Sequence, residues 1–88
     1  MWADIYDVYM ALTPEQSHAA RDLLGWTIED LAHAAGISIF TIRKFERGEF
    51  VPDAGVITSV QRAFEGAGVE FAPPQPGRPG VRMTTRRR

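Results

Sequence analysis

The feature that most constrains the fold of this 88-residue chain is a pair of short helical patterns joined by a tight turn. Residues 27–35 and residues 38–47 each place apolar side chains at helical spacing. Thr27 and Ser38 stand at their starts, where a hydroxyl oxygen can accept hydrogen bonds from free backbone N–H groups. Gly36 lies between the two patterns, because glycine adopts a positive φ at the lowest cost. The two helices are therefore predicted to meet at a fixed angle.

Residues 13–25 predict a longer helix before this pair. Thr13 is a cap residue, and Gln16 follows three positions later, as a capping box requires. Pro14 suits the first helical position, and Gly25 ends the pattern. The expected inward face consists of Ala19, Ala20, Leu23 and Leu24.

The C-terminal third combines one more helix with short strands. The helix is predicted to start at residues 52–53 and to end near Gly66, with Val56, Ile57, Val60 and Phe64 on its buried face. Residues 69–72 alternate like a strand, and residues 81–84 predict a second one after a proline-rich turn. We expect the strand region, residues 69–84, to help form a homodimer, since a domain of this size buries a limited part of its surface.

The first residues, 1–12, predict an amphipathic arm. Its apolar face comprises Trp2, Ile5, Tyr6, Tyr9 and Leu12, and Asp4 and Asp7 fall on the other face. Two interpretations fit this arm. Packing on the domain's own core is the favoured one, and a face that binds a partner protein is the other.

Charge is distributed unevenly along the chain. Residues 1–70 carry five basic and eleven acidic side chains, a sum of −6, whereas residues 71–88 carry five arginines and no acid, a sum of +5. The basic tail, residues 85–88, contains Arg86, Arg87 and Arg88. It fits an arm that contacts nucleic acid, and it fits a solvated terminus equally well.

Composition excludes several classes of function. A chain without cysteine has no disulfide framework and no thiolate metal site. His18 and His33 are the only histidines, and neither lies in a ligand or catalytic motif, so we expect no enzyme, no cofactor and no metal. The apolar runs are too short to span a bilayer, and the start does not resemble a signal peptide. We therefore expect a cytoplasmic, nucleoid-associated protein.

Two capped helices around a glycine turn form the helix-turn-helix pattern, in which the second helix lies in the DNA major groove. Arg43 could then bond a guanine edge, and Lys44 a base or a phosphate, although both also suit a plain solvated helix face. Hydroxyl groups near helix starts suit phosphate contacts. By position, the DNA-facing candidates are Thr27, Ser38, Ile39, Phe40, Thr41, Arg43 and Lys44.

Residues 21–52, RDLLGWTIEDLAHAAGISIFTIRKFERGEFVP, resemble the lambda-repressor/Cro-like helix-turn-helix regulators of the xenobiotic-response-element type. Residues 68–71 (GVEF) and 80–83 (GVRM) are similar to the end of a compact bacterial subgroup. The resemblance implies a mainly α fold, with a four-to-five-helix domain over residues 13–68 and strands over residues 69–84 in place of the last helix. It also implies a transcriptional regulator that binds double-stranded operator DNA as a homodimer.

The resemblance gives Arg21 and Glu46 a structural role. Members of the family typically pair an arginine and a glutamate at these positions, which ties the first helix to the recognition helix. Breaking a half-buried pair of this kind is costly, because one charge is left unpaired.

Apolar residues depart from the family pattern at two places. Ile28 stands where the family usually has a glutamine that clamps phosphate, and Ile39 and Phe40 stand where polar residues usually begin the recognition helix. Apolar groups there can pack on thymine methyls, or they can form a surface that binds protein. The alternative function is therefore a protein-binding regulator, of antiactivator or antitoxin-like type, whose contact residues would be Trp2, Ile5, Tyr6, Tyr9, Ile39 and Phe40.

Overall fold

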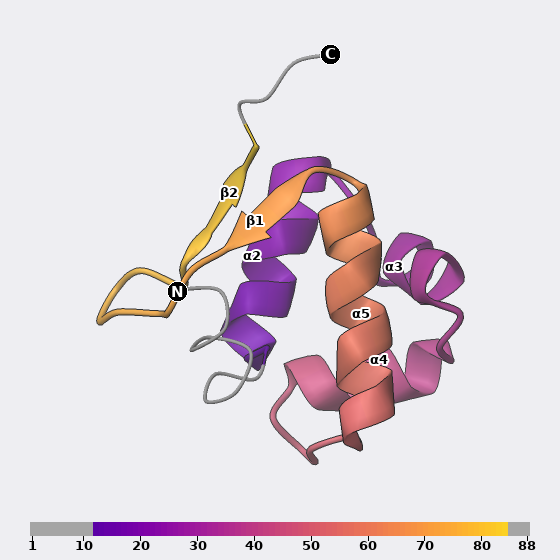
Figure 1. Cartoon of the computed structure of the whole chain (residues 1–88). Helices are drawn as coiled ribbons and strands as arrows, with labels where there is room; N and C mark the ends of the chain where they lie inside the picture. The colour runs from indigo at the N-terminus through magenta and orange to yellow at the C-terminus, as the bar shows by residue number, and fades with distance from the viewer. Residues whose placement is uncertain (1–11, 85–88) are drawn as a thin grey trace.

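The computed structural model describes residues 12–84 and confirms the predicted fold class (Figure 1). These residues form four helices and two strands, which are α2 (Pro14–Leu24), α3 (Ile28–Ala35), α4 (Ile39–Glu46), α5 (Ala54–Gly66), β1 (Val69–Phe71) and β2 (Val81–Met83). The strands pair antiparallel, as a hairpin beside the helices. The basic tail and the arm, apart from Leu12, lie outside the described residues. Within residues 12–84, no helix combines the length and apolarity needed to cross a membrane.

Local sequence signals fix where the helices begin and end. Thr13 Oγ1 accepts a hydrogen bond from Gln16 N at 3.0 Å, and Gln16 Oε1 accepts one from Thr13 N at 3.1 Å, which completes the predicted capping box. The hydroxyl of Thr27 caps α3 in the same way. Gly25 and Gly36 both have φ of 70°, so each ends its helix in the left-handed conformation that favours glycine.

The core lies between the helices and β1, with α3 packed against α5 and α4 packed against both α2 and α3. Phe64 of α5 is fully buried; its ring stacks on Trp26 with centroids 5.8 Å apart and meets Phe71 of β1 edge-on at 6.0 Å. Aromatic contacts of this kind add to the stabilisation that comes from the apolar area they bury. The buried apolar side chains are Leu12, Ala20, Leu31, Ala32, Ile42, Phe45, Ile57, Val60, Phe64 and Val69.

The inward face of α2 differs from the prediction. Ala20 is buried and Leu24 packs against the core, but Ala19 is only partly buried and does not belong to the core. Leu23, which was expected to face inward, is 45% exposed, so that assignment was wrong. Gln16 and Ser17 are fully buried instead. Both polar side chains have partners there, because Gln16 Nε2 donates to the carbonyl of Ala72 at 3.1 Å and Ser17 donates to a carboxylate. Long-range hydrogen bonds of this kind leave no signal in the helical periodicity.

The hairpin is closed by a backbone contact that excludes a side chain. The register pairs Val69 with Met83 and Phe71 with Val81, and Ala72 N donates to Gly80 O at 2.8 Å beyond the last pair. Gly80 has φ of 84°, and a Cβ atom at this position would overlap the carbonyl of Ala72. The close approach of the two chains therefore requires glycine at this position.

We predict that Gly80→Ala lowers the free energy of unfolding by about 2–4 kcal/mol, because it adds a backbone clash to a positive φ. Gly77→Ala is the matched control, since Gly77 has φ of 74° but a Cβ atom there would meet no other atom within 4 Å. The control should cost about 1–2 kcal/mol, which is the left-handed penalty alone. Urea denaturation measures both, and equal losses would contradict the role given to the Ala72 carbonyl.

Candidate nucleic-acid interface

Helix α4 has one buried side and one side that faces away from the core. Ile42 and Phe45 are buried against the core, whereas Phe40 is 65% exposed. The positions three, four and seven residues after Phe40 carry cations, and they share its face of the helix. These cations are Arg43, Lys44 and Arg47.

An aromatic ring and a cation pack together on this face. Lys44 Nζ lies over the ring of Phe40, 4.8 Å from its centroid, which is a cation–π contact. The contact orients Phe40 along the helix while leaving most of its ring exposed. Ile39, beside it in the first turn, is 36% exposed. The start of α4 therefore presents two large apolar side chains on the surface, where a binding partner can contact them.

A buried ion pair holds the far end of α4 against α2. Arg21 Nη2 lies 2.7 Å from Glu46 Oε1, and Arg21 Nε lies 3.0 Å from Glu46 Oε2. The two side chains are 11% and 7% exposed. Hydrogen bonding to the Glu46 carboxylate raises the pKa of Arg21 above its ordinary value, because it favours the charged guanidinium. The pair therefore remains ionic on the arginine side at every physiological pH.

The remaining polar groups of this pair also have partners. Ser17 Oγ donates to Glu46 Oε2 at 2.5 Å, and Arg21 Nη1 donates to the carbonyl of Trp26 at 3.2 Å. His18 Nδ1 lies 2.9 Å from Arg21 Nη2. A buried ion pair stabilises a fold when its other hydrogen-bonding positions are filled, as they are at this site.

The hydroxyl groups near the helix starts differ in whether their proton is still free to form a hydrogen bond with another molecule. Ser38 Oγ accepts from Thr41 N at 3.1 Å and donates to Thr41 Oγ1 at 2.9 Å, so its single proton is already used. Thr27 Oγ1 accepts from Asp30 N at 3.0 Å, and its proton is not needed for that bond. Thr27 and Thr41 are therefore better donors to a phosphate than Ser38, which serves as a cap.

Acidic side chains surround the start of α3. Glu29 and Asp30 are exposed in its first turn, and the Asp30 carboxylate caps Thr27 N at 2.9 Å. These charges weaken the attraction of that helix end for a phosphate. Ile28 packs against the core, as the helical spacing of residues 27–35 indicates, so this departure from the family pattern does not add to an exposed apolar surface.

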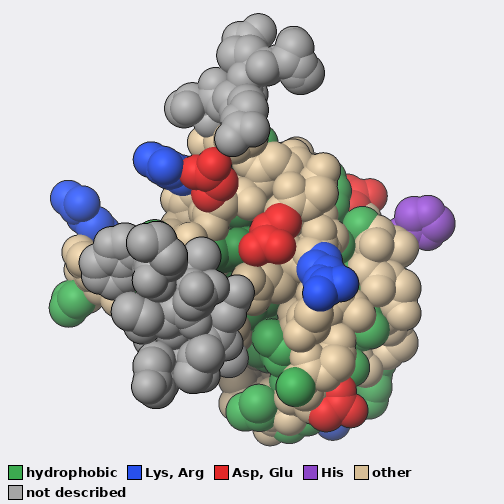
Figure 2. All heavy atoms as spheres, viewed as in Figure 1, with side chains coloured by type: hydrophobic (Ala, Val, Ile, Leu, Met, Phe, Trp, Pro, Cys, Tyr) green, Lys and Arg blue, Asp and Glu red, His purple; other side chains and the backbone are tan. Residues whose placement is uncertain are grey.

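The hairpin and α5 do not offer a basic surface either. Figure 2 shows cations next to acids on the described part of this face, with hydrophobic side chains gathered near the end where α4 leads into α5. Arg82 Nε, for example, lies 2.9 Å from Glu70 Oε1. Arg43 and Lys44 of α4, followed by Arg47 at its C-cap, therefore form the side of the described chain best suited to an anionic partner, although Arg47 Nη1 also lies 3.8 Å from Glu49 Oε2.

Sequence reasoning did not select two residues of this region. Arg47 follows Phe40 by seven residues, a spacing that could have placed it on the exposed face, and its side chain is 63% exposed. His18 is an exposed residue of α2, and its ring also contacts the Arg21–Glu46 pair. Trp2, Ile5, Tyr6, Tyr9, Arg86, Arg87 and Arg88 lie outside the described residues.

Two short helices joined at Gly36, with the second one exposed along a basic face, define a helix-turn-helix protein. A family model described as helix-turn-helix matches residues 18–69, which is more than half of the chain. The chain therefore belongs to this family of lambda-repressor/Cro type. It is 37% identical over 57 residues to YazB, an uncharacterized HTH-type transcriptional regulator of Bacillus subtilis (strain 168), in a match that covers 65% of this chain and 83% of YazB.

Regulators of this family are generally not enzymes. Within residues 12–84, no group of three or more His, Asp or Glu side chains is arranged to hold a metal ion.

We predict that Arg21→Met lowers the free energy of unfolding by about 3–5 kcal/mol, because it leaves the Glu46 carboxylate buried without its cation. Changing Glu46→Met as well should restore part of the loss. Arg82→Met is the control, since that side chain is 77% exposed in its ion pair with Glu70. It should cost less than about 1 kcal/mol. Equal losses in Arg21→Met and Arg82→Met would show that burial does not set the strength of the first pair.

Proposed function

We propose that the protein is a transcriptional regulator that binds DNA sequence-specifically by inserting α4 into the major groove. The observation that carries this proposal is the division of α4 into a buried side, fixed by Ile42, Phe45 and Glu46, and an exposed basic face. A helix that reads bases must be held rigidly by its own domain, because its side chains have to meet base edges in a defined register.

Each side chain of this face has a specific task in the proposal. Arg43 bonds the O6 and N7 atoms of a guanine, which is the commonest specific contact in the major groove. Lys44 and the hydroxyl of Thr41 contact phosphates and set the register. Ile39 and Phe40 pack on thymine methyl groups, which explains why apolar residues begin a helix that faces DNA.

We propose in addition that the regulator binds as a homodimer, with the hairpin at its interface and Arg86–Arg88 as arms that contact phosphates. The apolar face of α5 is buried in the core, but Met83 of β2 is 38% exposed. We predict a dimer by sedimentation at high micromolar concentration, with or without DNA. Removal of residues 86–88 should weaken binding to all DNA alike and flatten its salt dependence. A monomer under both conditions would refute the dimer, and an unchanged salt dependence would refute the arms.

A second function is favoured by the exposure of Phe40 and Ile39. In this alternative, the start of α4 docks on another regulatory protein, as an antiactivator or antitoxin-like partner would. Residues 1–70 sum to −6, and this charge repels phosphates, which favours a protein partner over DNA. In the first function these two apolar side chains contact thymine methyl groups, whereas in the second they contact a partner protein.

We predict that Arg43→Ala weakens binding to the specific site by about 1–3 kcal/mol and changes binding to random DNA much less. Arg62→Ala is the matched control, because Arg62 lies exposed on α5, outside the α4 surface. It should lower the affinity for both DNAs slightly and equally. Fluorescence anisotropy on the two duplexes measures the difference. Equal effects of Arg43→Ala on both duplexes would remove Arg43 as a base-reading residue.

We predict that Ile39→Ser combined with Phe40→Ser separates the two functions. If both residues pack on thymine methyls, the double variant loses affinity at operators that contain these thymines. If they bind protein, the variant keeps DNA binding and loses its partner in a pull-down. Leu23→Ser is the control, since Leu23 is equally apolar and 45% exposed on α2. A folded double variant that keeps both activities would contradict both functions for this surface.

A further inference from the structure

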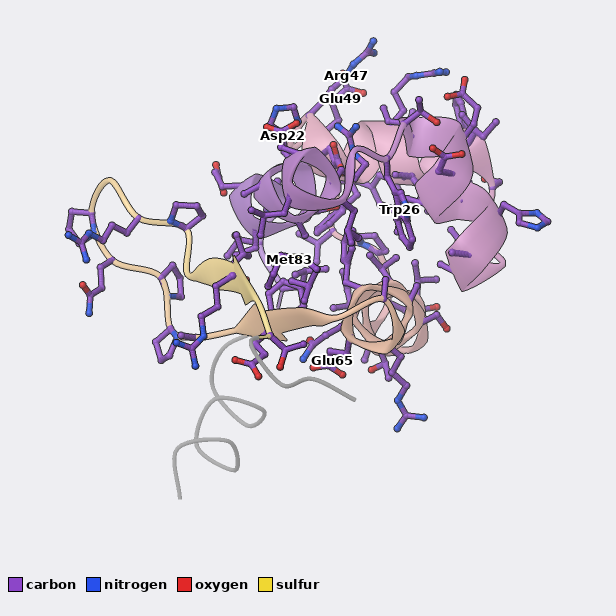
Figure 3. All side chains as sticks on the ribbon, turned by 90° about the horizontal axis from the view of Figure 1, so that it is seen from above. Asp22, Trp26, Arg47, Glu49, Glu65 and Met83 are labelled. Carbon is purple, nitrogen blue, oxygen red and sulfur yellow. The ribbon has the colours of Figure 1, made fainter. Side chains whose placement is uncertain are left out.

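A groove runs between α2 and the loop that joins the two strands. It encloses about 730 Å³, and it is lined mainly by apolar atoms. His18, Ala19 and Asp22 form the α2 wall, and Pro74 and Pro79 stand on the loop opposite. Figure 3 shows the loop projecting from the body beside the helix that carries Asp22.

Both walls of this groove are held in place by the fold. Gln16 Nε2 donates to the carbonyl of Ala72 at 3.1 Å, which ties the end of β1 to α2. Within the loop, Gln75 and Arg78 exchange two backbone hydrogen bonds of 2.8 Å each, so the chain turns there in a defined way. The groove therefore does not depend on an occupant for its shape.

The chain enters the described structure at the end of this groove. Leu12 is 3% exposed and belongs to the core, and it is the last member of the apolar face that began at Trp2. Thr13 lines the groove and has an extended backbone, with φ of −93° and ψ of 158°. The backbone at Thr13 therefore does not continue the helical path of α2, and Thr13 itself stands at the groove.

We propose that the groove is the docking site of the N-terminal segment of the same chain, residues 1–11, with Trp2, Ile5, Tyr6 and Tyr9 directed into it. As a helix, eleven residues span about 16 Å, and the α2 wall from Pro14 to Asp22 spans about 12 Å, so the lengths match. The apolar lining suits aromatic rings, and the opposite face of the segment keeps Asp4 and Asp7 in water. Covalent attachment beside the groove gives this occupant an effective concentration that a separate partner lacks.

Docking would act on the recognition helix without touching it. Glu46 lines the groove, and its carboxylate is the partner of Arg21. A docked segment excludes water from that ion pair, which strengthens the link between α2 and α4. This inference concerns the interior support of α4, and it does not depend on whether α4 binds DNA.

The test uses the two tryptophans of the full chain. In a Trp26→Phe variant, Trp2 is the sole tryptophan, and its fluorescence reports its own environment. We expect blue-shifted emission and a several-fold lower acrylamide quenching constant than in a free peptide of residues 1–11. Ala19→Glu, which places a charge in the groove, should move both values to those of the peptide. Ala34→Glu on the exposed side of α3 is the control and should change neither.

Should the Trp26→Phe variant fail to fold, contacts in the unchanged protein decide the question. Nuclear Overhauser effects between the Trp2 indole and the Ala19 methyl group are then expected, and their absence would overturn the proposal. Peptide-like fluorescence of Trp2, or its insensitivity to Ala19→Glu, would overturn it as well. Protection of Trp2 that disappears on dilution would have the same consequence, because the occupant would then be the segment of a second copy.

Discussion

The ion pair between Arg21 and Glu46 is the interaction on which the placement of α4 depends. Helix α4 has eight residues, which is too short for a helix to be stable by itself in water. Ile42 and Phe45 pack this helix against the apolar core. Apolar contact is non-directional, however, and does not fix the rotation of the helix about its axis. The forked contact from Arg21 does fix it, because two donors meet two oxygens in one plane.

Neighbouring groups of the fold hold that pair in place. Ser17 and the Trp26 carbonyl fill its remaining hydrogen-bonding positions. Trp26 in turn stacks on Phe64, which joins this polar centre to the aromatic core. Through α5 the same core reaches β1, whose Phe71 meets Phe64. The hairpin and α4 are therefore parts of one packed unit.

Sequence reasoning succeeded where the cause of a structure is local. Thr13 with Gln16 and the positive φ at Gly36 depend on residues within one turn, so the helix ends and the fold class could be predicted. Long-range partners could not be predicted in this way. Gln16 is buried because the carbonyl of Ala72, at the end of β1, accepts its hydrogen bond. Leu23 remains exposed because no distant segment within residues 12–84 covers it.

In the candidate site, too, features with a local cause could be predicted from the sequence, and features that depend on distant residues could not. The resemblance to a family supplied the pairing of Arg21 with Glu46, which periodicity alone would have left as a surface arginine and a surface glutamate. The spacing of Phe40, Arg43 and Lys44 was visible in the sequence, but Arg47 on the same face was not selected. Ile28 departs from the family pattern, but its helical spacing already placed it on the inward face, and it packs on the core where α3 meets α5.

The charge distribution sets a limit on how this protein can bind DNA. With −6 on residues 1–70, attraction to phosphate has to come from the few cations of α4 and from the arginines near the C-terminus. In the proposed function, phosphate contacts are therefore few, and base contacts would have to supply a large share of the affinity for a specific site.

The most direct test of this account is a titration of the full chain against promoter DNA from its own locus and against a scrambled duplex of equal length, over a series of salt concentrations. The account predicts tighter binding to the promoter at every salt concentration. Affinity for both duplexes should fall with salt along similar slopes, because phosphate contacts are shared and base contacts are not. Equal affinity for the two duplexes throughout, or no binding to either by the folded protein, would contradict a DNA-reading role for α4.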